Sequence, residues 1–73
     1  MTHVAAIGAR RRVTGLATAG VVVLPADDPE AVRAAWRRLP ADVGLVILTP
    51  DAAAALGPGP LEAEDPLTAV MPA

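Results

Sequence analysis

Four short apolar runs, separated by polar and turn-forming residues, divide this chain into alternating segments. The runs cover residues 3–7, 21–24, 43–48 and 67–71. Each run has the length of a strand, and the third is continuously apolar, which is typical of a strand buried on both faces. Strands of that kind belong to parallel sheets covered by helices. The third run is therefore expected to be an interior strand.

Two of the intervening segments carry clear helix-start signals. Asp28 can cap a helix that begins at Pro29 and ends before Pro40. The apolar stripe of this helix recurs at helical spacing and consists of Val32, Ala35, Trp36 and Leu39. Thr49 can cap a second helix, with a proline at its first position and a stop at Gly57. Both crossovers are therefore expected to be helical.

The remaining segments give weaker signals. Arg10–Arg12 are expected to form a polar turn, followed by one or two helical turns between Thr14 as a start and Gly20 as a C-terminal cap. Two glycines and two prolines alternate over residues 57–60, which are therefore expected to be irregular, and residues 61–66 to be an acidic connector.

The order β-α-β-α-β-α-β predicts an α/β fold. The expected architecture is a small open four-stranded parallel sheet with helices on both faces, a receiver-like three-layer sandwich. Residues 1–73 are expected to form one domain. Much of the 53% hydrophobic content is alanine and the only aromatic residue is Trp36, so little apolar surface is available for burial. A domain of this composition is expected to depend on a partner or an oligomer for stability.

Composition excludes several classes of protein. The net charge is −2, with six arginines and no lysine, which argues against nucleic-acid binding. Without cysteine, neither a disulfide nor a thiolate metal site is possible, and a reducing cytoplasm is a natural location. No apolar run approaches about 20 residues, and no signal peptide precedes the first strand, so direct membrane insertion is not expected.

No catalytic, metal-binding or cofactor-binding group emerges at the expected strand ends. His3 is the only histidine, and the chain has neither serine nor cysteine to pair with it as a nucleophile. The glycines do not follow the dinucleotide-binding spacing. The neighbouring acids Asp27, Asp28 and Glu30 are accounted for mainly by helix-start chemistry. The role of Arg10–Arg12 stays open between a contact with an acidic partner or phosphate and a solvated loop.

A receiver domain has the same alternation of elements, but it needs two features that are weak here. It requires an acidic pair after the first strand to hold magnesium, and Ala9 and arginines stand there instead. It also requires a phospho-accepting aspartate after the third strand. Asp51 follows a proline in the first turn of a helix, where capping alone explains a carboxylate.

Several segments taken in order resemble one known family. Ala6-Ile7-Gly8, the stretch from Val13 to Val21, the strand into Thr49 and the segment from Pro66 to Pro72 resemble the F subunit of V-type and archaeal-type rotary ATPases. Leu16 stands where that family usually has Phe, and Ala9 where it has an acid. The chain ends at Ala73, before the helical extension of the family, so the resemblance is to a short form.

The resemblance implies a non-catalytic subunit on the central rotor stalk of an ion-translocating ATPase. Its partners would be the coiled-coil D subunit and other subunits of the complex, and it would lie in the cytoplasm, peripheral to the membrane. The matching family element suggests a partner-binding surface formed by Thr14, Gly15, Leu16, Ala19 and Gly20. Two alternatives stay open for these residues and for the chain. The residues could instead pack against the sheet, and the protein could be a stand-alone interaction module or a degenerate receiver-like domain.

Overall fold

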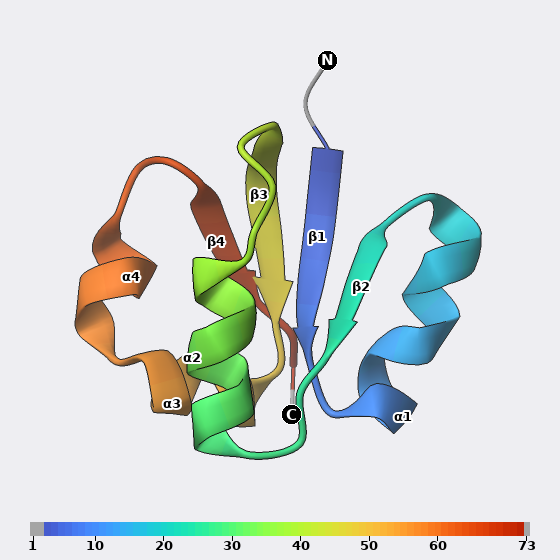
Figure 1. Ribbon diagram of the computed structural model, residues 1–73, viewed down its shortest axis with the longest axis horizontal. Helices are drawn as coiled ribbons and strands as arrows, with labels where there is room; N and C mark the ends of the chain where they lie inside the picture. The colour runs from blue at the N-terminus through green and yellow to red at the C-terminus, as the bar shows by residue number, and fades with distance from the viewer. Residues whose placement is uncertain (1–2, 73) are drawn as a thin grey trace.

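The computed structural model of the protein describes residues 3–72 and has the predicted α/β fold (Figure 1). The four strands form one all-parallel sheet in the order β2-β1-β3-β4, so β3 is interior as predicted. The elements along the chain are β1 (His3–Gly8), α1 (Arg10–Val13), the 3-10 helix η1 (Thr14–Ala19), β2 (Val22–Pro25), α2 (Pro29–Arg37), β3 (Val43–Leu48), α3 (Pro50–Leu56), α4 (Pro58–Glu62) and β4 (Leu67–Val70).

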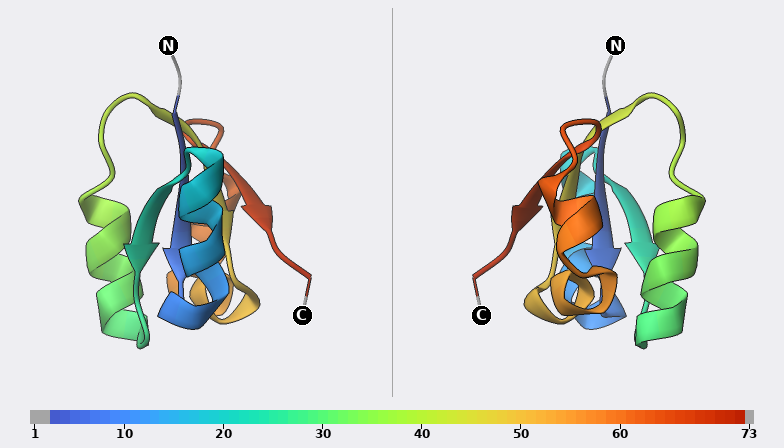
Figure 2. Two further views of the ribbon diagram at one scale, coloured as in Figure 1. Left: turned by 90° about the vertical axis from the view of Figure 1, so that its right-hand side faces the viewer. Right: turned by 90° about the vertical axis from the view of Figure 1, so that its left-hand side faces the viewer.

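Helices lie on both faces of the sheet, as expected for a three-layer sandwich (Figure 2). Helices α2 and α3 pack against each other and over the central strands, whereas α1 and η1 cover only β1 and β2 on the other face. Helix α4 packs against β4, where the hydroxyl of Thr68 donates to the carbonyl oxygen of Leu61 at 3.2 Å. Within residues 3–72, no helix is long and apolar enough to cross a membrane.

The main core lies between the sheet and the pair α2 and α3. It is built from small and branched side chains, namely Ala5, Ile7, Ala26, Val32, Ala35, Val43, Val46, Leu48, Ala52 and Ala53. The alanines of α2 and α3 let both helices approach the strands closely. Trp36 is half-buried against this core, which confirms its predicted packing role. On the other face of the sheet, Val13 of α1 is fully buried.

The two predicted helix caps are both present. The carboxylate of Asp28 accepts a hydrogen bond from the backbone N–H of Ala31 at 2.7 Å, and the hydroxyl oxygen of Thr49 accepts one from Ala52 at 3.2 Å. Each bond satisfies one of the N–H groups that a helix start leaves without an intrahelical partner. Helix α2 ends at Arg37, earlier than predicted, because Pro40 disfavours helical backbone at the residue before it.

The expected turn at Arg10–Arg12 is wrong, because these residues begin helix α1. The carbonyl oxygen of Ala9 accepts the N–H groups of Arg12 and Val13, which starts the helix before Thr14. Thr14 does not cap a helix start; its hydroxyl donates back to the carbonyl of Arg10. Gly20 does end the segment as predicted, in the left-handed conformation with φ of 82°.

The expected irregular stretch at residues 57–60 and the expected connector at 61–66 are partly wrong. Residues Pro58–Glu62 form the short helix α4. Both prolines fall in its first turn, where N–H groups have no intrahelical acceptor and the missing donors cost nothing. Strand β4 ends at Val70, one residue before the predicted end, although the N–H of Met71 still donates to the carbonyl of Leu48.

Candidate functional site

Helix η1 presents an uncharged surface of small residues to the outside of the domain. Of the five residues predicted to bind a partner, Thr14, Gly15, Ala19 and Gly20 are exposed, and Leu16 is half-buried. A Cβ atom placed on Gly15 or Gly20 would meet no other atom within 4 Å. Packing against the sheet therefore uses Leu16 alone, and the other four residues are accessible. We call these five residues the η1 surface.

Local chemistry explains why this segment forms a 3-10 helix. The hydroxyls of Thr14 and Thr18 donate to the carbonyl oxygens of Arg10 and Gly15. Such bonds from threonine to a preceding turn compete with regular helix bonding. Gly15 adds backbone freedom and contributes no side-chain packing. The buried Val13 and the half-buried Leu16 anchor the segment to the sheet, so its remaining residues face solvent.

The face of the sheet that carries α1 and η1 has a second part, over β3 and β4, that no described helix covers. The strand register places Leu45 beside Val4, and Ile47 beside Ala6 and Ala69, all on the side of the sheet that carries η1. Leu45 and Ile47 are half-buried and Ala69 is exposed. These residues form a second uncharged region, over β3 and β4 on the same face of the sheet.

The sequence reasoning did not identify this bare part of the sheet. The handedness rule for crossovers would have found it once the strand order was known. Right-handed crossovers in a 2-1-3-4 strand order place the first helix on one face and the later helices on the other. Half of the first face is then left bare over the third and fourth strands. That inference needs the strand order, which apolar periodicity alone does not provide.

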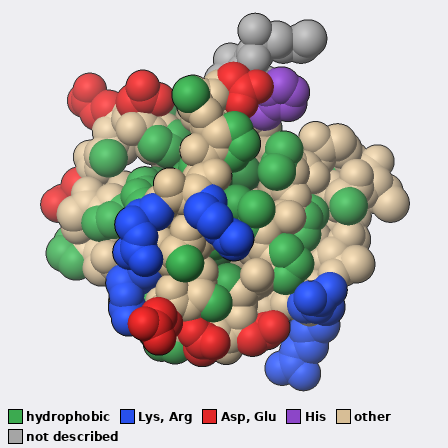
Figure 3. Space-filling view, in the orientation of Figure 1, with side chains coloured by type: hydrophobic (Ala, Val, Ile, Leu, Met, Phe, Trp, Pro, Cys, Tyr) green, Lys and Arg blue, Asp and Glu red, His purple; other side chains and the backbone are tan. Residues whose placement is uncertain are grey.

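Basic side chains border this region at the carboxyl end of the sheet. Figure 3 shows a group of basic side chains over α1, separate from the group over α2. Arg10, Arg11 and Arg12 are exposed, and the guanidinium of Arg12 donates to the carbonyl oxygen of Pro72 at 3.0 Å. This bond ties the end of α1 to the segment that follows β4. One of the three arginines therefore has a structural contact, and all three remain accessible.

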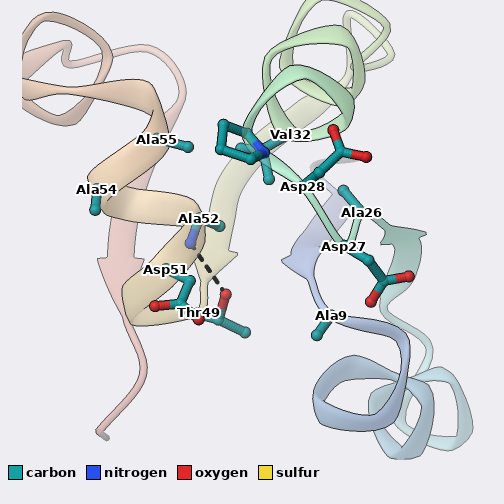
Figure 4. Close-up of a pocket in the computed structure, with 11 residues that line it drawn as sticks. Ala9, Ala26, Asp27, Asp28, Val32, Thr49, Asp51, Ala52, Ala54 and Ala55 are labelled. Carbon is teal, nitrogen blue, oxygen red and sulfur yellow. Dashed lines mark hydrogen bonds between the residues drawn. The ribbon is translucent and has the colours of Figure 1, made fainter.

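A hollow of about 410 Å³ opens at the carboxyl ends of β1, β2 and β3 (Figure 4). Ligands of open α/β sheets bind at this end, in the crevice between strands whose connections leave in opposite directions. Its apolar lining comes mainly from alanines and from Val32 and Pro29, while Thr49 lies between β3 and α3. The hollow therefore lies where ligand sites of such sheets are found. What it could bind depends on the polar groups that line it.

The acidic residues around the hollow are turned away from it or engaged with the backbone. Figure 4 shows the carboxylates of Asp27 and Asp51 pointing outward on opposite sides. Asp27 accepts a hydrogen bond from the N–H of Arg10, and Asp28 caps α2. Residues 3–72 contain no group of three side chains arranged to hold a metal ion. The hollow is therefore lined mainly by apolar side chains, and the carboxylates of Asp27 and Asp51 do not converge in it.

The chain matches no protein-family model, no curated protein and no solved structure. The case for a function therefore rests on the residues and on the surfaces described above.

Proposed function

We propose that this protein is a non-catalytic subunit of the central rotor stalk of a V-type or archaeal-type rotary ATPase. In this role it binds a coiled-coil stalk subunit and helps the stalk carry torque between ATP turnover and proton or sodium movement. The observation that carries the proposal is the exposed η1 surface on a small α/β domain. Its location would be cytoplasmic, held at the membrane through the assembled complex.

The character of the η1 surface suits contact with a helical partner. Glycine and alanine leave the backbone accessible, so another helix can approach closely. The surface carries no charge, so another helix can pack on it without burying a charged group of this chain. Binding would also stabilise a domain whose core is built mostly from alanine and valine, because any partner that binds only the folded state shifts the equilibrium toward it.

Co-purification with a rotary ATPase D subunit tests this proposal. We expect a complex with the wild-type chain and at least about a tenfold loss of affinity in the Ala19→Arg variant, since an arginine there would have to lose solvent in the interface. Ala41→Arg is the matched control, because Ala41 is also exposed but lies in the loop before β3. Isothermal titration calorimetry measures both affinities. A wild-type chain that does not bind the D subunit contradicts the proposal.

A degenerate receiver-like domain is the second candidate, supported by the strand order and by Asp51 beside the hollow. If the receiver chemistry were retained, acetyl phosphate would label Asp51 in a magnesium-dependent reaction. We expect no labelling, because the neighbouring carboxylates do not converge on a cation site. Mass spectrometry of the wild-type chain and of Asp51→Asn checks this expectation. Labelling confined to Asp51 would favour the receiver reading over the stalk subunit.

A further inference from the structure

Strand β4 holds both of the large hydrophobic side chains that are exposed in residues 3–72. Leu67 is 57% exposed and Val70 is 51% exposed. The register places Leu67 beside Leu45 and Val70 beside Leu48, so the two side chains lie on opposite faces of the sheet. Exposed apolar groups on both faces of one edge strand are what an additional neighbouring strand would cover.

The backbone of β4 offers unpaired positions on its outer side. The N–H of Met71 donates to the carbonyl of Leu48 at 2.7 Å. Because successive residues of a strand point their polar groups to alternate sides, Leu67 and Ala69 share this direction, whereas Thr68 and Val70 point theirs away from β3. Strand β4 is at the edge of the sheet, so those groups face outward. The other edge strand, β2, is less available because α1 and η1 pack on it and its apolar side chains are half-buried.

Two prolines flank β4 symmetrically about Ala69. Pro66 precedes the strand and Pro72 follows it. Both lie an even number of residues from Thr68 and Val70, so their backbone positions point to the same outer side. Neither proline has an N–H to offer to an added strand. In an antiparallel pair centred on Ala69, each proline of one strand would lie opposite a proline of the other. The prolines therefore allow pairing of the strand residues and end it on both sides, which specifies the register.

Charges at the two ends of β4 are opposite in sign. Arg12 is held at the carboxyl end through its bond to the Pro72 carbonyl. Glu64 and Asp65 are exposed immediately before the amino end. An antiparallel neighbour of identical sequence brings each basic end beside an acidic end, whereas a parallel neighbour would bring like charges together. The charge pattern thus favours a second copy in the antiparallel orientation.

We propose that β4 binds β4 of a second copy of this chain in antiparallel fashion about a two-fold axis through Ala69. Thr68 and Val70 exchange backbone hydrogen bonds with the partner's Val70 and the partner's Thr68. Leu67 packs beside the partner's Met71 on the face that carries η1, and Arg12 lies near the partner's Asp65. The contact is isologous, so it closes as a dimer. It leaves the η1 surface free and is independent of the proposed stalk function.

Analytical ultracentrifugation of the purified chain tests this dimer. An edge-to-edge contact of one short strand is smaller than a standard interface of about 1,600 Å². We therefore expect a weak dimer whose dissociation constant lies between about 10 µM and about 1 mM. Val70→Lys should raise the dissociation constant at least about tenfold, because it places a charge on the paired edge. Arg33→Glu on α2 is the control and should dimerise like the wild type.

Charge exchange identifies the partner surface even if an edge variant fails to fold. Arg12→Glu and Asp65→Arg should each weaken their own dimer, and an equimolar mixture of the two should form a heterodimer more tightly than either variant alone. Circular dichroism confirms that each variant is folded. A chain that stays monomeric up to about 1 mM would overturn the proposal. So would a dimer that is unchanged by both Val70→Lys and the charge exchange.

Discussion

Replacing Leu48 by alanine is expected to destabilise the domain by about 2–5 kcal/mol, the range for removing a large aliphatic side chain from a core. Leu48 lies at the carboxyl end of β3, has no exposed surface and belongs to the core against α2 and α3. A chain of 73 residues has a total stability of about 4–11 kcal/mol. The substitution therefore removes a large share of what keeps the chain folded, and the urea midpoint of unfolding should fall clearly.

Leu67→Ala is the matched control for this substitution. It removes the same atoms from a strand of the same sheet, but Leu67 is 57% exposed. Its cost should stay below about 1 kcal/mol, because little apolar area is returned to water. Urea denaturation followed by circular dichroism measures both differences, at a concentration low enough to keep the chain monomeric. Equal losses in the two variants would mean that the core does not lie where the structure places it.

Gly8→Ala is expected to cost about 1–3 kcal/mol, the range for forcing extra atoms into a packed site. A Cβ atom at Gly8 would lie 2.3 Å from Cγ2 and 2.7 Å from Oγ1 of Thr49. Thr49 is only 3% exposed and its Oγ1 caps α3, so the side chain cannot move without breaking that hydrogen bond. The close approach of β1 to the start of α3 thus requires a residue without a side chain.

Gly15→Ala separates this packing effect from the general effect of replacing glycine. The added methyl group on η1 would meet no atom within 4 Å, so the variant should be as stable as the wild type or slightly more stable. Thermal melts of the two variants and the wild type give the comparison directly. A fourth protein combines Gly8→Ala with Thr49→Ser, which removes the clashing methyl group and keeps the cap. This combination should recover part of the lost stability, and a failure to recover any would mean that the methyl group of Thr49 is not the cause of the loss.

The site residues show how far sequence reasoning extends. The η1 residues could be named from a resemblance, but small residues are equally compatible with close packing and with exposure. The structure decides between these two readings, because only Leu16 turns toward the sheet and the other four residues are exposed. The exposed edge of β4 was not predicted, since an apolar run such as residues 67–71 looks the same whether it is covered or bare.

Local chemistry in the sequence determined the elements whose ends are marked by clear capping residues and prolines. Asp28 with Pro29 and Thr49 with Pro50 specify helix starts through hydrogen bonds that span three residues, so no distant contact is needed. The continuous apolar run of β3 indicates an interior strand, but the predicted burial on both faces is wrong in part: Val46 and Leu48 are buried toward α2 and α3, whereas Leu45 and Ile47 on the other face are only half-buried. These signals give the order of elements and hence the α/β class. Only the tertiary structure decided the conformation and exposure of the other segments. Their local signals are weak, so packing against distant strands determines whether they form helices and which residues they bury. In the folded chain Pro58–Glu62 form a helix, most residues of η1 are exposed, and β4 lies at the edge of the sheet with no further strand beside it.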